Sequence, residues 1–129
     1  MYYKAFKMTN DKKNKGDITP FVIIFLGFIQ QAVDNLNTVL ANKIEQMQFY
    51  HKGILKAVKE EKTRDVLYIL MQNSLFGEEG LTVEDIAKIL EVSVPTVRNY
   101  MNHIGNEMLK VSKIGHRNAY DINFEYFAD

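Results

Sequence analysis

The sequence has 129 residues, of which 47% are hydrophobic and 25% are charged, as is usual for a soluble globular protein. Its 16 Lys and Arg residues balance 16 Asp and Glu residues, so no net charge draws the whole molecule to nucleic acid or to a membrane surface. It has no cysteine, which excludes disulfides, thiol nucleophiles and cysteine zinc sites and is typical of a cytoplasmic protein.

An apolar run near the N-terminus, Phe21 to Ile29, follows five lysines and has the outline of a secretory signal. The charged stretch before it is too long for a signal, Gln30 and Gln31 interrupt it, and no small-x-small cleavage pattern follows. A membrane span needs about 20 apolar residues, and this run is shorter. We therefore expect no membrane association and a cytoplasmic location.

The first long element is expected to be a helix that runs from about Pro20 into the 50s. Thr19 can cap this helix, and Pro20 suits its first position because no backbone donor is needed there. Gly53 is a possible break. Apolar residues recur at the helical spacing of three and four, namely Phe25, Ile29, Val33, Leu36, Leu40, Ile44, Met47, Ile54 and Val58.

Such a helix could pack on its own domain or against a second copy of itself. A helix of this length beside a small domain would leave much of its apolar stripe exposed to water unless something covers it. We therefore expect a homodimer formed through residues 20–58.

A charged stretch, Lys59 to Thr63, divides the chain into a helical segment, 1–60, and a second domain, 61–129. The first segment carries nine Lys and Arg residues against five Asp and Glu residues, and the second carries seven against eleven. Any surface for an anionic partner in the second domain must therefore be local.

The second domain is expected to begin with three helices. The first covers "TRDVLYILMQNSLF" and has one apolar face. Thr82 caps the second and forms a capping box with Asp85, three residues later. Ser93 caps the third, with Pro95 in its first turn. The inward spacing of the third helix, through Val97, Met101, Ile104 and Met108, predicts that it continues to Met108.

A β-hairpin is expected to follow, with "GHRN" (Gly115 to Asn118) as its turn. Two helices joined by a short turn, preceded by a helix and followed by a hairpin, make a winged helix-turn-helix. The small Ala87 allows the two helices to approach closely. The predicted fold is therefore mainly α, with a long N-terminal helix or helix pair followed by a three-helix winged helix-turn-helix with a small β-hairpin.

In this architecture the helix after Ser93 is the recognition helix, whose first turn would enter the major groove of DNA. Arg can bind the edge of guanine with two hydrogen bonds, Asn can do the same for adenine, and cations at the hairpin tip can contact phosphates. The candidate DNA-binding residues are Ser93, Thr96, Arg98, Asn99, Asn102, Lys113, His116 and Arg117.

A second function remains open because the cations are few. Affinity for DNA that does not depend on sequence comes mostly from neutralising phosphates, and the domain from Leu81 onwards is net negative. Winged helices also dock proteins and form dimers, and a fold alone does not decide between these functions. The sequence thus predicts either a DNA-binding module for transcription regulation or a module for protein interaction and oligomerisation.

No catalytic constellation is visible. The three histidines, His51, His103 and His116, lie in separate elements, and the sequence has neither a glycine-rich phosphate loop nor a nucleophile elbow. We expect no enzyme activity from this chain, no metal and no cofactor.

Two stretches, "YYKAF" (Tyr2 to Phe6) and "DITPFVIIFLGFIQQAV" (Asp17 to Val33), resemble the region after the active site in Fic (filamentation induced by cAMP) family proteins. In many members a winged helix-turn-helix follows, as expected here over Thr63 to Phe124. Fic enzymes transfer a nucleotide monophosphate, usually AMP, to a hydroxyl group of a target protein.

Their signature, His-Pro-Phe, two residues, then Gly-Asn-Gly/Lys-Arg, does not occur in this chain, so the resemblance carries over no catalytic residue. It implies the C-terminal portion of such a protein, acting in DNA binding or as the oligomerisation or target-docking module of a Fic-type nucleotidyltransferase.

Overall fold

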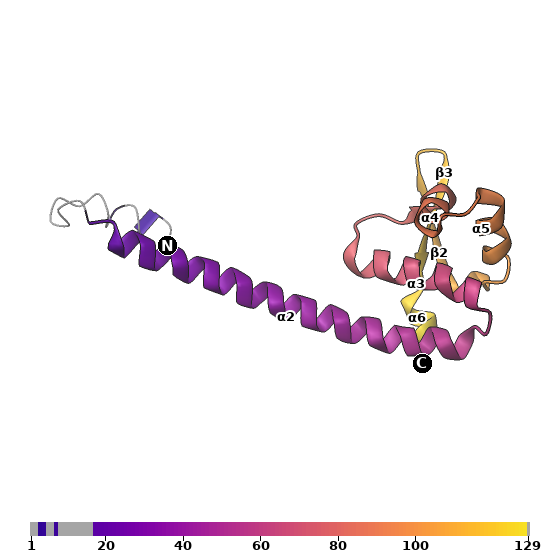
Figure 1. The fold of residues 1–129 in the computed structure, drawn as a ribbon, viewed down its shortest axis with the longest axis horizontal. Helices are drawn as coiled ribbons and strands as arrows, with labels where there is room; N and C mark the ends of the chain where they lie inside the picture. The colour runs from indigo at the N-terminus through magenta and orange to yellow at the C-terminus, as the bar shows by residue number, and fades with distance from the viewer. Residues whose placement is uncertain (1–2, 5–6, 8–16, 129) are drawn as a thin grey trace. The chain divides into compact units, whose positions relative to one another are not determined.

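A computed structural model describes residues 3–4, 7 and 17–128, so most of the Tyr2 to Phe6 stretch lies outside the described residues. The mainly α fold, with a long N-terminal helix and a small hairpin, is confirmed (Figure 1). In chain order the elements are α2 (Thr19–Ala57), α3 (Glu61–Phe76), β1 (Leu81–Thr82), α4 (Val83–Leu90), α5 (Val94–Met101), the 3-10 helix η2 (Asn106–Met108), β2 (Leu109–Ile114), β3 (Arg117–Ile122) and α6 (Phe124–Phe127).

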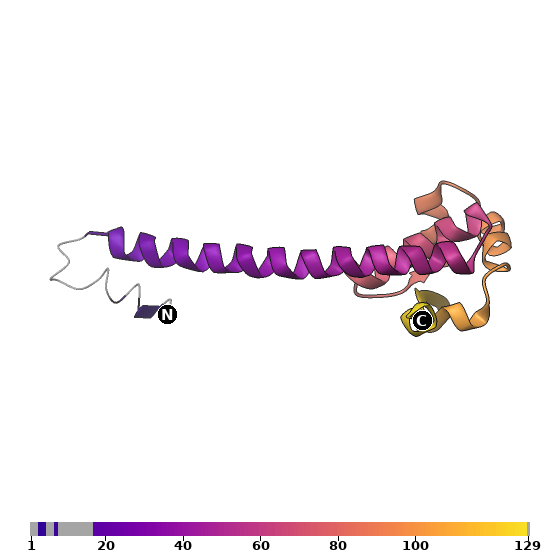
Figure 2. The same cartoon turned by 90° about the horizontal axis from the view of Figure 1, so that it is seen from below.

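Helix α2 is continuous through Gly53 (Figure 2). A Cβ at Gly53 would lie 3.4 Å from the Phe127 side chain, so this glycine serves close packing and does not break the helix. The start of α2 also differs from the prediction that Thr19 caps the helix, because Thr19 is already its first residue. The carboxylate of Asp17 accepts hydrogen bonds from the Thr19 amide at 2.9 Å and from its hydroxyl at 2.6 Å, which lowers the pKa of Asp17.

Length and composition alone would also let α2 cross a membrane, and none of its most apolar stretch is buried. The core helix of a soluble protein and a signal sequence near the N-terminus share this length and composition, so they are weak evidence for a membrane span. The absence of membrane association therefore stays a prediction.

The chain forms two compact units, one ending at Asn42 and the other beginning at Lys43. The second unit contains the last turns of α2, where Ile54 is fully buried and Met47 and Tyr50 pack against the core. The division between the two units therefore falls earlier than the expected domain boundary near residue 60. The end of α2 supplies core side chains to the second unit, residues 43–129, which we call the winged domain.

The inner face of α3 is the one that the sequence predicts. Val66, Leu67, Leu70 and Met71 are all buried in the centre of the second unit. Thr63, at the start of the same face, is buried too, and its hydroxyl donates to the Glu60 carboxylate at 3.1 Å. This helix is the support on which α5 and strand β3 rest.

The sheet has three antiparallel strands in the order β1-β3-β2. Strand β1 was not expected, because a two-residue strand is too short to show a period. The hairpin runs from the pair Leu109 and Ile122 to the pair Ile114 and Arg117. Its turn is narrower than the predicted "GHRN" stretch, because Arg117 already belongs to β3.

The two helices of the helix-turn-helix are α4 and α5, separated by Glu91 to Ser93. The capping box of Thr82 and Asp85 is present, and Ala87 is buried. At the C-terminal end of α4 Glu91 lies in the left-handed region, with φ 56°, which is uncommon for a residue other than glycine.

Helix α5 ends at Met101, so the prediction that it continues to Met108 is wrong. The amides of His103 and Ile104 bond the carbonyls three residues back, which tightens the chain into a turn, and Gly105 is extended. Ile104 and Met108 are nevertheless buried, from the turn and from η2. Helix α6, also unexpected, returns the chain to α2 (Figure 1). The centroids of the Phe124 and Tyr50 rings lie 4.4 Å apart.

Candidate nucleic-acid interface

The first turn of α5 is held by its own side chains. The Ser93 hydroxyl accepts a hydrogen bond from the Thr96 amide at 3.3 Å, and the two hydroxyl oxygens lie 2.7 Å apart. Ser93 is exposed and Thr96 is half-buried. Both side chains therefore take part in capping α5. Only the hydrogen-bonding capacity that the cap does not use is free to contact a ligand.

The outer face of α5 carries three exposed polar side chains, Arg98, Asn99 and Asn102. The opposite face is anchored by Val97, which is fully buried. Val97, which directly precedes them in the sequence, packs inward, and the side chains of Arg98 and Asn99 are exposed to solvent, as the sequence predicts.

The hairpin places the other candidates at its tip. Gly115 has φ 62°, a conformation that favours glycine, and it forms the turn that exposes His116 and Arg117. Lys113 is exposed on β2, where its Cα partner across the hairpin is Asn118.

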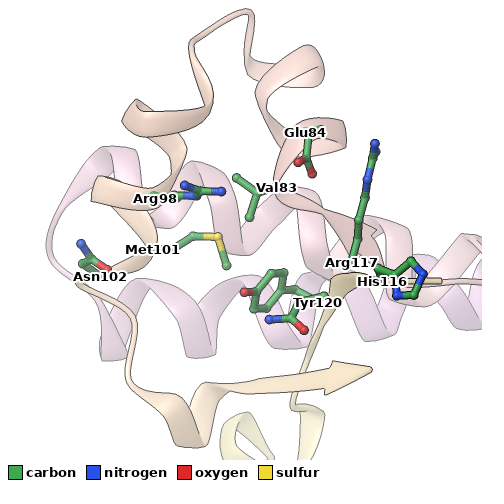
Figure 3. A pocket seen from close by; sticks show the side chains of 9 residues that line it. Val83, Glu84, Arg98, Met101, Asn102, His116, Arg117 and Tyr120 are labelled. Carbon is green, nitrogen blue, oxygen red and sulfur yellow. The ribbon is translucent and has the colours of Figure 1, made fainter. Parts of the chain in front are cut away.

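Four of the eight candidates line a single pocket of about 580 Å³ (Figure 3). Arg98 comes from α5, Asn102 is the residue that follows this helix, and His116 and Arg117 come from the hairpin. In Figure 3 these two pairs lie on opposite sides of the pocket, with Met101 and Tyr120 between them. The lining does not include Ser93, Thr96, Asn99 or Lys113.

Negative charge lies at the same place. Glu84, in the first turn of α4, also lines the pocket, and it appears near Arg117 in Figure 3. The neighbouring Asp85 has a lowered pKa, first because Thr82 donates hydrogen bonds to its carboxylate, with smaller contributions from Lys88 and Arg117. The two arginines of the pocket are therefore partly offset by carboxylates.

The sequence did not predict that Glu84 would lie in this pocket, or that the side chains of Met101 and Tyr120 would line it. Only the antiparallel pairing of β1 with β3 brings the start of α4 beside the hairpin, and β1 gave no signal. Glu84 could have been suspected from the capping box alone, since acidic residues concentrate in the first turn of a helix.

The arrangement offers two permanent cations, Arg98 and Arg117, and two further hydrogen-bonding side chains, Asn102 and His116, around one pocket. Guanidinium groups bind phosphate or the edge of guanine with two hydrogen bonds, and an amide side chain can bind adenine. Within the part of the chain that the structure describes, no group of three His, Asp or Glu side chains is arranged to hold a metal ion.

A second depression, of about 400 Å³, lies between the end of α2 and α3. Its walls are mostly apolar, and the His51 ring stacks on the Tyr68 ring with centroids 4.6 Å apart. Burial raises the pKa of the Tyr68 hydroxyl, so that it remains a neutral donor at physiological pH.

Comparison of the sequence with protein-family models gives no match, and comparison with curated proteins gives none either. A functional assignment therefore rests on the fold and on the side chains described above.

Proposed function

We propose that the winged domain binds double-stranded DNA, with α5 in the major groove and the hairpin tip against the sugar-phosphate backbone of the DNA. One observation carries this proposal. Arg98 and Asn102, at the C-terminal end of α5, line one surface pocket with His116 and Arg117 of the hairpin, which are far from them in sequence (Figure 3). A recognition helix and a wing must present their donors together in this way to contact one duplex.

The roles follow from the chemistry of each side chain. Arg98 suits the edge of guanine, while Asn99 and Asn102 suit adenine. Arg117, Lys113 and His116 suit phosphate oxygens, and such contacts orient the domain but do not read sequence. Ser93 and Thr96 shape the first turn of α5, where the Thr96 amide donates to the Ser93 hydroxyl.

The charge balance limits the affinity of one copy. Each phosphate contact contributes to affinity through the release of counterions, and few cations mean few contacts. Glu84 reduces the potential further. We therefore expect weak, salt-sensitive binding by one domain and stronger binding when two domains act on one duplex. Regulation of transcription is the cellular role that such a module would serve.

The test is a gel-shift titration against a pool of duplexes with a randomised centre, at about 50 mM and about 200 mM salt. The double variant Arg98→Ala/Arg117→Ala is expected to bind at least about tenfold more weakly than wild type, at about 1–3 kcal/mol per lost contact. Lys59→Ala/Lys62→Ala loses the same charge from exposed residues outside the pocket and is the matched control.

The proposal is wrong if wild type binds no duplex at the lower salt, or if the two double variants lose affinity equally. In the second case the binding would reflect overall charge and not this surface. Circular dichroism of each variant shows whether the fold is kept.

The resemblance to Fic family proteins stays a prediction, and the DNA-binding proposal does not depend on it. If the domain binds no DNA, its role as a protein-interaction or oligomerisation module becomes the leading one.

A further inference from the structure

An apolar stripe runs along α2 with the alternating spacing of four and three that is typical of helices packed side by side. Each of its six members is between 40% and 58% exposed. The members are Val22, Leu26, Ile29, Val33, Leu36 and Leu40. We call this set the Val22–Leu40 stripe.

The same spacing continues toward the C-terminal end of α2, where the stripe is covered. Met47, Tyr50 and Ile54 are the next members, and all three pack in the core of the winged domain, Ile54 with 0% exposure. The apolar spacing that packs inside the winged domain after residue 43 therefore also occurs before residue 43, where no described residue covers the apolar side chains.

Lys43 occupies the stripe position between the two parts. Its ammonium group donates a hydrogen bond to the carbonyl of Leu75 and lies 5.5 Å from the centre of the Phe76 ring. Lys43 is thus tied to the end of α3, and it marks where the covered part of the register stops.

The exposed part needs packing to stay helical. No side chain in residues 19–42 of α2 is buried. The only charged residue between Asp17 and Lys43 is Asp34, so no ion pair between successive turns of the helix stabilises this stretch. Many of its residues are β-branched, which are weak helix formers. In proteins, most of the stability of such a helix comes from covering its apolar face.

From these observations we propose that the Val22–Leu40 stripe is a self-association surface, covered by the same stripe of a second copy of this chain. The positions that flank the stripe carry no charge, so identical helices can meet without repulsion between like charges. Those flanking residues are Ile23, Phe25, Gln30, Ala32, Asn37 and Val39. With no charges to select a different partner, the surface is complementary to itself.

A bilayer fits the same segment less well. The stretch that is apolar on all sides, Phe21 to Ile29, is only about 13 Å long at 1.5 Å per residue, against about 30 Å for the hydrocarbon core. A span would have to place Gln30, Gln31 and Asp34 in hydrocarbon, and these polar groups lie off the stripe. Beyond residue 29 the face opposite the stripe is polar, with Gln31, Asp34 and Thr38, which is the pattern of a helix packed in water.

The test compares two double variants of the full chain by light scattering at micromolar concentration. Val33→Glu/Leu40→Glu places two charges in the stripe. Gln31→Glu/Thr38→Glu places the same two charges, also seven residues apart, on the opposite face of α2. All four positions are exposed and lie outside the buried core, so the winged domain is expected to fold in both variants.

Wild type is expected to have a mass of at least twice the 15.0 kDa of one chain. The control variant is expected to keep that mass, and the stripe variant to fall to a single chain. A wild-type mass of one chain, or an equal effect of the two variants, overturns the proposal. So does flotation of monomeric wild type with phosphatidylcholine vesicles, which would assign the stripe to a membrane. None of these readouts involves DNA, so this proposal can fail while the DNA-binding proposal stands.

Discussion

Thr82 and Asp85 bond one another in both directions at the start of α4. The Asp85 amide donates to the Thr82 hydroxyl at 3.2 Å, and the Thr82 amide donates to the Asp85 carboxylate at 3.1 Å. The Thr82 hydroxyl also donates to that carboxylate, at 2.8 Å. These bonds satisfy backbone donors that the first turn of a helix leaves free, and they fix the chain where β1 passes into the helix-turn-helix.

We predict that Asp85→Ala lowers the free energy of unfolding by about 1 kcal/mol at pH 7, the usual effect of a lost cap. The pKa of Asp85 is lowered from 3.8 in the folded protein, so its stabilising effect is complete above pH 3.8 and is lost as the pH falls through the folded value. Denaturant unfolding followed by circular dichroism between pH 7 and about pH 3 measures both effects. Glu78→Ala, at an exposed loop carboxylate, is the control, and a difference between Asp85→Ala and wild type that does not narrow in acid would contradict the prediction.

The protein is expected to be more stable with glycine in place of Glu91. Its φ of 56° costs a residue with a Cβ roughly 1–2 kcal/mol, while glycine adds flexibility to the unfolded chain, so Glu91→Gly should raise the free energy of unfolding by about 0.5–1 kcal/mol. Glu91→Ala removes the same charge and keeps the Cβ, so it should give no such gain. Equal stability of these two variants in thermal or denaturant unfolding would show that the backbone conformation is not the cause.

The pocket at α5 predicts a variant that binds DNA more tightly. Removing the charge of Glu84 with Glu84→Gln should raise DNA affinity by about threefold, or ~0.6 kcal/mol, because the two arginines then act without an opposing carboxylate. The slope of affinity against salt concentration should stay the same, since no phosphate contact is added. Glu61→Gln, an equal charge change on α3 away from the pocket, should have a smaller effect in the same gel-shift titration. An equal gain from both variants would argue against local electrostatics.

The two parts of the α2 register should differ in what they stabilise. Ile54→Ala opens a cavity in the core of the winged domain and should lower its free energy of unfolding by about 2–5 kcal/mol. Leu36→Ala removes an exposed side chain and should change that quantity by less than about 0.5 kcal/mol at a protein concentration below that at which two copies associate. Tyrosine fluorescence during denaturation follows the domain, and similar losses from both changes would show that Leu36 belongs to its core.

Much of the candidate site could be predicted because local rules govern it. The cap at Ser93, the turn at Gly115 and the outward faces of Arg98 and Asn102 all follow from hydrogen bonding and helical spacing within a few residues. The end of α5 could not be read in the same way. Ile104 and Met108 keep the helical spacing and are buried, but they reach the core from a turn and from η2. Spacing identifies which residues face the core and does not identify the backbone that carries them.

The sequence alone determined the long α2, the helix-turn-helix with its capping box, and the hairpin, because each depends on contacts between residues close in the chain. Only the tertiary structure decided that Met47 to Ile54 belong to the winged domain, that β1 pairs with β3, and that Glu84 lines one pocket with Arg98 and Arg117. These relationships join residues that are distant in sequence. Their free energy comes from burying shared surface, which no local pattern records.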